Sequence, residues 1–350
     1  MRNAHGGDVY TAELKDKKLL DFSVNLNPFG IAEEIKQAIR GFADDTPAYP
    51  DDKCRMLTSA VAAKEGVGED HIVITAGAAD AIYRIAGRFM PKRALLPSPT
   101  FTEYEGALDQ NGCVIDYKET CAAEGFIFGQ SFIDAIGKDH DIIFFCNPNN
   151  PTGLLEADET ILGIVGKCAE SGSRAVIDEC FMDFVEDSST HTLAHEITSH
   201  KNALILRSFT KMYSIPGIRL GYVICGSAED AAALKEFNEP WAVSGIGQKC
   251  GIVALALNGY EEKTAAYVAA EREKLYAAFR DLGIQYFPSS VNYILFTCGD
   301  RMLYEKMLSC GIMIRKCGNY RGLDDTYYRV AVKSETDNEK LISAFREIFS

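Results

Sequence analysis

Short apolar segments alternate with longer amphipathic segments through most of this chain, which limits the folds open to it. The short segments predict strands at residues 71–75, 94–97, 141–146, 175–178, 203–208 and 220–225. Amphipathic patterns after several of them predict helices, for instance at residues 78–89, 159–170 and 228–237. Such alternation is typical of βαβ units. We therefore expect an α/β fold with a mostly parallel central sheet flanked by helices.

The pattern changes near residue 240, which indicates a second structural unit. A charged amphipathic stretch over residues 248–282 predicts one or two helices. Shorter segments follow at residues 293–297, 302–310, 313–315, 328–332 and 338–348, the last of them a predicted helix. A chain of 350 residues is long enough for two domains. We expect a large domain over residues 31–239 and a small α+β domain formed by residues 1–30 and 240–350.

The charge balance excludes some partners. The chain has 36 Lys and Arg residues against 50 Asp and Glu residues, a formal net charge of -14. We therefore expect neither nucleic acid nor a membrane as partner, and any anionic ligand needs a local cluster of cations. There is no signal-peptide pattern, and the 11 cysteines are scattered without a C-x-x-C pair. This favours free thiols in the cytoplasm and no metal site.

Polar and small residues follow the predicted strands, at the edge where ligands collect in α/β sheets. Gly77, Ala78 and Ala79 follow the first strand, and such small residues let N–H groups approach a phosphate at a helix N-terminus. On this segment alone, an ordinary βα turn is the favoured interpretation. Tyr104 lies in an aromatic segment after the second strand, and three asparagines stand between prolines in the loop at 147–153.

Charged residues follow the next two strands. Asp178 closes an apolar run, so we expect a partly buried carboxylate that needs a cationic or donating partner. Ser208, Lys211 and Arg219 then follow one another within twelve residues. A single lysine is usually a solvated surface residue, but Lys211 stands between a strand end and an aromatic loop.

The order of these elements resembles the class I and II aminotransferase family of fold-type I pyridoxal-phosphate enzymes. The resemblance covers nearly the whole chain and is most specific at residues 147–153 and 208–221. It implies pyridoxal 5'-phosphate as cofactor, and a homodimer with shared active sites. The fold it implies is a large domain with a mostly parallel central sheet and a small α+β domain.

The resemblance also implies roles for the catalytic residues, Lys211, Asp178 and Tyr104. Lys211 links covalently to the cofactor aldehyde and then carries a proton. Asp178 pairs with the pyridine nitrogen and keeps it protonated, which makes the ring a better electron sink. Asn150 donates to the phenolic oxygen of the ring, and Tyr104 stacks on the ring face.

Further roles concern two anionic groups. Tyr49 matches a tyrosine that reaches the cofactor phosphate of the neighbouring subunit. Arg329 matches the arginine that clamps the substrate carboxylate, for which a planar guanidinium is suited. The cofactor phosphate is held by a helix N-terminus, a hydroxyl and a cation, from Gly77, Ala78, Ala79, Ser208 and Arg219.

One position departs from the family pattern. The motif Asp-Glu-x-Tyr usually places a tyrosine hydroxyl on the phenolic oxygen, whereas this chain has Phe181 there. Phenylalanine cannot donate that hydrogen bond, so Lys211 is expected to experience a different field. This disfavours plain transamination.

Two branches of the family fit the chain. Its length and the loop at 147–153 are similar to histidinol-phosphate aminotransferases, which transfer an amino group to 2-oxoglutarate. Residues 5–7, 21–28, 240–243 and 319–324 are similar to the L-threonine O-3-phosphate decarboxylases of cobalamin biosynthesis, which form (R)-1-aminopropan-2-yl phosphate. These flanking motifs favour the decarboxylase, with an aminotransferase as the alternative.

Both branches act on phosphorylated substrates, so we expect a phosphorylated amino acid or amino alcohol. In the decarboxylases a second arginine, fourteen residues before the carboxylate arginine, binds the substrate phosphate. Arg315 stands at that spacing, although a surface cation at a strand end would look the same. His5, Gly6 and Asn25 would complete the pocket.

Two hypotheses that would place the chain in other classes of protein are weaker. A non-catalytic nucleotide-binding module would use the glycines of segment 245–247, but no strand precedes them. A metal hydrolase would use His191, His195 and His200, but the chain has no H-E-x-x-H pattern there.

Overall fold

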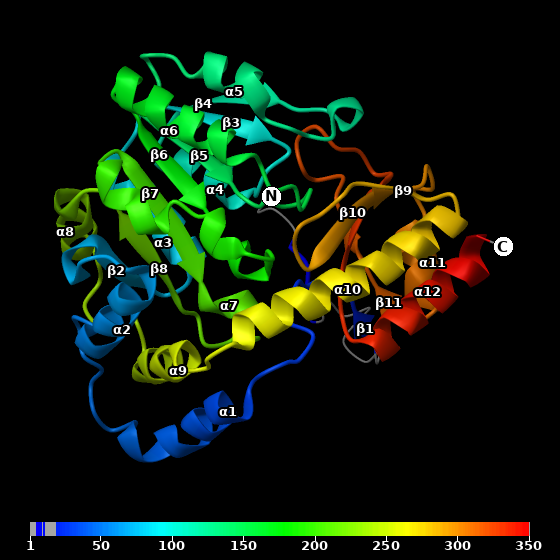
Figure 1. Ribbon diagram of the computed structural model, residues 1–350, viewed down its shortest axis with the longest axis horizontal. Helices are drawn as coiled ribbons and strands as arrows, with labels where there is room; N and C mark the ends of the chain where they lie inside the picture. The colour runs from blue at the N-terminus through cyan, green and yellow to red at the C-terminus, as the bar shows by residue number, and fades with distance from the viewer. Residues whose placement is uncertain (1–4, 9, 11–18, 350) are drawn as a thin grey trace.

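The computed structural model describes residues 5–8, 10 and 19–349, and a seven-stranded sheet is the largest feature of these residues (Figure 1). The strand order is β2-β8-β7-β6-β5-β3-β4. β8 is antiparallel to β7 and to β2, and the other neighbours are parallel, so the expected mostly parallel sheet is confirmed. The strands are β2 (Ile72–Thr75), β3 (Arg93–Ser98), β4 (Val114–Glu119), β5 (Ile142–Cys146), β6 (Arg174–Asp178), β7 (Ala203–Ser208) and β8 (Gly221–Cys225).

Helices cover both faces of this sheet, which explains the continuous apolar character of its central strands. Along β5, Ile142 and Phe144 enter one buried cluster, whereas Ile143 and Phe145 enter the other. This alternation follows from the period of two along a strand. The helices around the sheet are α2 (Arg55–Glu65), α3 (Ala78–Phe89), α4 (Glu103–Gln110), α5 (Gly129–Ala135), α6 (Asp158–Ser171), α7 (Phe209–Met212) and α8 (Ala228–Glu236).

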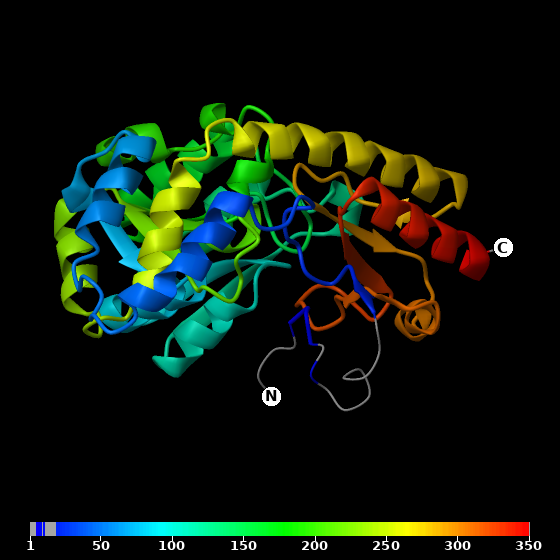
Figure 2. The ribbon, with the colours of Figure 1, turned by 90° about the horizontal axis from the view of Figure 1, so that it is seen from below.

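A smaller α+β unit lies beside the large sheet. Its four-stranded antiparallel sheet has the order β12 (Arg315–Lys316), β13 (Tyr327–Ala331), β10 (Tyr293–Thr297) and β9 (Gln285–Tyr286). Helices α11 (Leu303–Ser309) and α12 (Glu335–Phe349) belong to the same unit. The early strand β1 (Leu20–Asp21) pairs with β11 (Ile312–Met313), so the start of the described chain lies along this unit (Figure 2).

The helix α10 (Tyr260–Asp281) runs from the large unit to the small one (Figure 1). Before it, α9 (Gly245–Leu255) packs against α1 (Glu33–Arg40) and α2. The division predicted at residue 240 assigned α9 to the small domain, but its contacts are with helices assigned to the large one. Short 3-10 helices lie at Gly41–Asp45, Glu69–His71, Ala122–Glu124, Met182–Phe184, Ser188–Thr190 and Ala194–Ser199.

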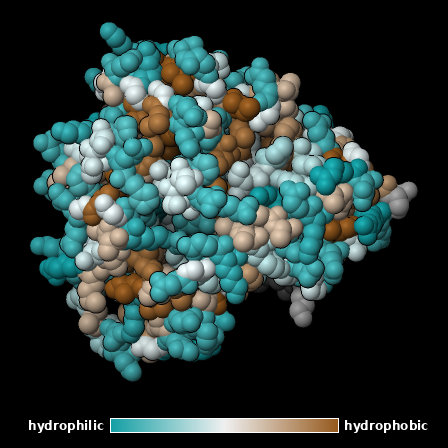
Figure 3. Space-filling view, in the orientation of Figure 1, coloured by the Kyte–Doolittle hydropathy of each residue, from teal (hydrophilic) through white to brown (hydrophobic). Residues whose placement is uncertain are grey.

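The surface is mostly hydrophilic on the face that Figure 3 shows, and apolar side chains gather there in separate patches. All eleven cysteines are unpaired thiols. Within the described part of the chain, no helix combines the length and the apolar character that crossing a bilayer requires.

Candidate active site

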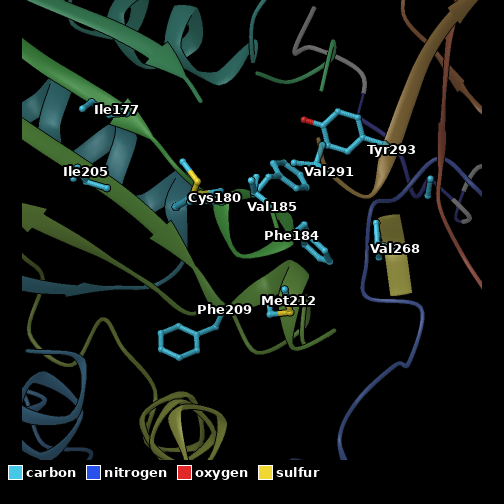
Figure 4. Packing of buried hydrophobic residues seen from close by; sticks show 14 of the residues in the cluster. Ile177, Cys180, Phe184, Val185, Ile205, Phe209, Met212, Val268, Val291 and Tyr293 are labelled. Atoms are coloured by element: carbon cyan, nitrogen blue, oxygen red, sulfur yellow. The ribbon is translucent and has the colours of Figure 1, made fainter. Parts of the chain in front are cut away.

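Asp178 is the last residue of β6, and its carboxylate is fixed at both oxygens. Oδ1 accepts from the backbone N–H of Cys180 at 3.0 Å, and Oδ2 accepts from the Tyr104 hydroxyl at 2.7 Å. The side chain is only 4% exposed. The partly buried carboxylate expected from the sequence is therefore present, with donors that orient it toward the carboxyl end of the sheet. Figure 4 shows Cys180 just beyond the end of the strand that carries Ile177.

Tyr104 lies differently from what the sequence suggested. Its side chain is fully buried, its ring stacks on Phe144 at 5.3 Å between centroids, and Phe101 meets it edge-on at 5.6 Å. A ring without exposed surface has no free face on which a cofactor could stack. Burial, with the Asp178 carboxylate beside it, raises the pKa of Tyr104 well above its ordinary value, so the hydroxyl remains a donor. Tyr104 thus orients Asp178, and the partly exposed Phe101 is better placed for stacking.

Lys211 lies in α7, one turn after the end of β7. Ser208 caps this short helix by accepting from the N–H of Thr210 at 3.2 Å, and Lys211 Nζ lies 3.4 Å from the same Ser208 oxygen. The Nζ atom is also 5.3 Å from the centre of the Phe181 ring. The backbone N–H of Asn27 donates to the Lys211 carbonyl at 3.0 Å, so the early segment of the chain helps to hold the lysine.

Three of the residues predicted to hold a phosphate, Gly77, Ala78 and Ala79, lie at the N-terminus of α3. Gly77 precedes this helix with φ +97, and a Cβ there would lie 2.8 Å from the Arg219 guanidinium. Only glycine therefore admits the guanidinium so close to the backbone. Ala78 is the first helical residue, and Ala79 the second. Arg219 itself has φ +59, a strained conformation for a residue with a side chain, and such strain is concentrated at functional sites.

Asn150 and Arg329 form the centre of the site between the two units. Arg329 Nη1 donates to Asn150 Oδ1 through a short contact, and Nη2 donates to the Ser23 carbonyl at 3.3 Å. Since guanidinium has no acceptor, it directs the Asn150 oxygen toward itself and leaves the Nδ2 amide to donate elsewhere. This agrees with a role for Asn150 as a donor to a ligand oxygen.

Arg315 and Arg329 are brought together by strand pairing. They are direct partners on the antiparallel strands β12 and β13, and their side chains are 6% and 5% exposed. Directly opposite residues of such a pair project from the same face. Arg315 Nη2 also donates to Asn319 Oδ1 at 2.8 Å. The two guanidinium groups therefore define one cationic region.

The N-terminal segment closes part of this region. A cavity of about 430 Å³ is lined by His5, Gly6, Ser23 and Arg315, among others. His5 Nε2 lies 2.8 Å from the Glu103 carboxylate, and a Cβ on Gly6 would meet the Ser23 carbonyl at 2.2 Å. Three of the residues predicted to bind substrate thus border one cavity.

Unsatisfied polar atoms lie among these residues. Within the described part of the chain, Asn25 Oδ1 and Arg329 Nε are buried without a hydrogen-bond partner. Buried polar atoms of this kind are costly unless a ligand or water satisfies them. Together with the cradle at Gly77 and the fixed Asp178 carboxylate, they fit a ligand that carries a phosphate and a protonated ring nitrogen.

Tyr49 does not reach this site within its own chain. Its side chain is 82% exposed, and its ring lies 4.8 Å from that of Trp241, which is 48% exposed. The predicted contact of Tyr49 with a cofactor phosphate therefore requires another subunit.

Residues next to the site residues in the chain form a buried ionic cluster. Arg207, just before Ser208, contacts Glu179 at 3.1 Å and Asp183 at 2.9 Å. Burial raises the pKa of Glu179 to about 7, although Arg207 opposes this shift. Burial, with the Glu261 carboxylate nearby, raises the pKa of Asp183 to about 6. No sequence pattern indicates this cluster, because Arg207 and the two acids come from separate segments.

The histidines of the metal-hydrolase hypothesis lie outside the candidate active site. His191 pairs with Asp158 at 3.1 Å, and His195 borders a cavity of about 420 Å³ that also contains Arg207. Among the residues with described placement, no group of three or more His, Cys, Asp or Glu side chains is arranged to hold a metal ion.

Four features together define a fold-type I pyridoxal-phosphate enzyme. They are a seven-stranded α/β sheet, an aspartate at the end of one strand, a lysine in the turn after the next strand, and an arginine beside a helix N-terminus. The sequence profile of the family "Aminotransferase class I and II" matches residues 17–345. The chain belongs to this family and is an enzyme, and its cofactor is pyridoxal 5'-phosphate.

Individual relatives fall into the two expected branches. Threonine-phosphate decarboxylase of Salmonella typhimurium is 34% identical over 355 residues, covering 99% of this chain and 97% of the relative. Histidinol-phosphate aminotransferase 2 of Archaeoglobus fulgidus is 29% identical over 350 residues, covering 99% and 98%. The solved histidinol-phosphate aminotransferase from Clostridium acetobutylicum superimposes with a TM-score of 0.88 at 28% identity, covering 95% of this chain and 99% of that chain.

Some site residues were not assigned from the sequence. The Ser23 carbonyl accepts from Arg329, and the backbone N–H of Asn27 donates to Lys211 in α7. Backbone contacts of this kind leave no sequence signature. Phe101 lies in the same aromatic segment as Tyr104, and burial alone distinguishes the two.

Proposed function

We propose that this protein is a pyridoxal-phosphate-dependent lyase that releases the carboxylate of L-threonine O-3-phosphate as CO2 and forms (R)-1-aminopropan-2-yl phosphate. The name of the Salmonella relative, at 34% identity over nearly the full length of both chains, supports this. The aminotransferase relative is less similar, at 29%.

The observation that carries the proposal is the pair Arg315 and Arg329. Two buried guanidinium groups on one face of a sheet suit a substrate with two anionic groups. Threonine phosphate has a carboxylate and a phosphate. Histidinol phosphate has a phosphate but no carboxylate, so it would use only one of the two cations.

The chemistry divides among a few residues. Bound pyridoxal phosphate supplies an electron sink for the electron pair released at Cα. Asp178, oriented by Tyr104 and the N–H of Cys180, holds a proton at the ring nitrogen. Lys211 would hold the cofactor aldehyde through its amine and would carry the proton to or from Cα. Arg219 and the N-terminus of α3 hold the cofactor phosphate.

The outcome at Cα depends on how Arg329 holds the carboxylate. Loss of CO2 would require Arg329 to hold the carboxylate so that the bond from Cα to the carboxylate breaks in place of the Cα–H bond. Arg329, itself fixed by Asn150 and the Ser23 carbonyl, can hold it in this way while Arg315 binds the phosphate at the other end.

A second candidate is a histidinol-phosphate aminotransferase, or a related aminotransferase that uses 2-oxoglutarate. The TM-score of 0.88 with such an enzyme favours it. In that case Arg329 would act chiefly on the dicarboxylate substrate. Phe181 weighs against this candidate, because the site then lacks the hydroxyl that the family usually supplies.

A homodimer with shared active sites belongs to this proposal. Tyr49 and Trp241 form an exposed aromatic pair, and such pairs are typical of protein interfaces. A second copy that covers this pair would bring Tyr49 to the neighbouring cofactor phosphate.

Two parallel incubations test the proposal. In one, the cofactor-loaded protein receives threonine phosphate, and released CO2 is measured. In the other, it receives histidinol phosphate and 2-oxoglutarate, and glutamate is measured. The proposal predicts CO2 in the first and little glutamate in the second. Glutamate without CO2 would instead identify the aminotransferase.

A further inference from the structure

Tyr320 contacts residues of both anion-binding positions. Its hydroxyl donates to Asn150 Oδ1 at 3.4 Å, the same oxygen that accepts from Arg329. The Arg315 guanidinium carbon lies 5.5 Å from the centre of its ring. Tyr320 is 4% exposed. One buried side chain thus lies between the arginine expected to bind phosphate and the amide that Arg329 orients.

The loop that carries Tyr320 is fastened to the large unit independently of any ligand. The carbonyl of the next residue, Arg321, accepts from Ser98 Oγ at 2.8 Å, and its guanidinium carbon lies 3.8 Å from the centre of the Tyr117 ring. Gly322 has φ +83, and a Cβ there would lie 3.2 Å from Ser98 Oγ. The backbone therefore holds Tyr320 in place before substrate binds.

Tyr320 also brings a hydroxyl to Asn150. Phe181 stands where the family usually has a tyrosine, and its ring meets Tyr293 edge-on at 5.0 Å. Tyr320 reaches Asn150, whose free amide is expected to donate to the phenolic oxygen of the cofactor. Donation to Oδ1 draws electron density from the amide group and makes its N–H groups better donors.

We propose that Tyr320 is a positioning residue with two effects. Its hydroxyl, through Asn150, stabilises the anionic phenolic oxygen of the bound cofactor. Its ring supports the Arg315 guanidinium at a fixed separation from Arg329, and so selects substrates whose phosphate and carboxylate have a matching separation. The second effect rests on the proposed function, whereas the first does not.

A spectroscopic titration of the cofactor-loaded protein tests the hydroxyl. In Tyr320→Phe, the phenolic oxygen loses part of its stabilisation, so it holds a proton to higher pH. The midpoint of the pH-dependent absorbance change should rise by about 0.5 pH unit, as expected for one weak hydrogen bond. Tyr327→Phe removes another hydroxyl, at the start of β13, and should leave the midpoint unchanged. An unchanged midpoint in Tyr320→Phe would overturn this effect.

Steady-state kinetics test the ring. Tyr320→Leu should raise KM for threonine phosphate roughly 3- to 30-fold, the range of a desolvated cation–π contact, with a smaller change in kcat. Tyr320→Phe keeps the ring and should retain a KM near that of the wild type. Phe287→Leu is the matched control, because Phe287 belongs to the same buried cluster as Tyr320.

The outcomes separate the two proposals. Equal KM values in Tyr320→Leu and Phe287→Leu would overturn the spacing role of the ring. If the wild type releases no CO2 from threonine phosphate, the proposed function fails. The binding constant of threonine phosphate, measured from its perturbation of cofactor absorbance, then replaces KM, and the same comparison of variants decides the role of Tyr320.

Discussion

Arg315 and Arg329 stand directly opposite each other on the paired strands β12 and β13, with both side chains buried. Like charges at directly opposed positions destabilise a sheet. A ligand with two anionic groups offsets that cost, since each guanidinium then faces a negative charge. If the substrate is that ligand, as we propose, the free energy of this arrangement is linked to substrate binding, and truncating either arginine should reveal which anion it binds.

Arg315→Ala should weaken the use of threonine phosphate by tens to thousands of fold in kcat/KM. Removing one partner of a buried charge pair costs on the order of 2–5 kcal/mol. Unphosphorylated threonine, already a poor substrate, should change little. Steady-state assays with both amino acids provide the measurement. An equal loss on threonine and threonine phosphate would exclude a phosphate-binding role for Arg315.

Arg329→Ala is the companion variant. It should lower kcat/KM for threonine and for threonine phosphate alike, because both amino acids carry the carboxylate. An unchanged kcat/KM for threonine in this variant would show that Arg329 binds a group other than the carboxylate.

Asp178→Asn should lower kcat roughly 10²- to 10⁴-fold while substrate binding is largely kept. The amide preserves the shape of the side chain but removes the charge that keeps the ring nitrogen protonated. Tyr104→Phe should have a smaller effect of the same kind, because it removes one of the donors that orient the carboxylate. If only substrate affinity falls in Asp178→Asn, the residue is a structural acid.

Much of the fold could be predicted from periodicity. The central strands of the large sheet are buried on both faces, so they appear in the sequence as apolar runs. The strand β4 (Val114–Glu119) was not predicted, because it lies at the sheet edge and half of its residues are polar or charged. The sequence grouped α9 with the small domain, whereas its contacts are with α1 and α2. An amphipathic pattern indicates that a helix has a buried face, but it does not indicate which unit covers that face.

The site was less accessible to sequence reasoning. Asp178 ends β6, Lys211 follows β7 and Arg219 precedes the antiparallel β8. The sheet topology gathers these strand ends at one edge. Tyr104 was expected to stack on the cofactor, but its complete burial against Phe144 makes it a partner of Asp178 instead. Tyr320 stood in a segment noted for its similarity to decarboxylases, yet its contact with Asn150 crosses 170 positions and leaves no local pattern.

The buried carboxyl of Glu179 should make stability depend on pH. Its pKa is raised from 4.5 to about 7, so the folded state binds a proton more tightly than the unfolded state does. Its contribution to stability is complete below pH 4.5 and is lost as pH rises through about 7. The loss amounts to about 3 kcal/mol. Urea unfolding between pH 5 and pH 8 should therefore give a falling free energy of unfolding.

Glu179→Gln provides the control for this pH dependence. The amide cannot ionise, so the decline between pH 5 and pH 8 should be shallower than in the wild type. Part of the slope will remain, because the pKa of Asp183 is also raised, to about 6. An identical slope in the two proteins would show that Glu179 does not titrate in this range.

Shared active sites predict complementation between inactive chains. Lys211→Ala should retain cofactor without covalent attachment and lose turnover, and Tyr49→Ala should hold the cofactor phosphate poorly. A mixed dimer of the two contains one site with both native residues. Activity should therefore return on mixing, in proportion to the mixed dimers. If subunit exchange is demonstrated and activity stays absent, Tyr49 does not contribute to a shared active site.

The most direct measurement follows threonine phosphate labelled with ¹³C at its carboxyl carbon through one reaction with the cofactor-loaded protein. Nuclear magnetic resonance detects both products in the same tube. Decarboxylation predicts that the label leaves as CO2 and bicarbonate, in a yield equal to that of (R)-1-aminopropan-2-yl phosphate, without added 2-oxoglutarate. Retention of the label in an organic acid, or a reaction that proceeds only with 2-oxoglutarate, would contradict the proposed function.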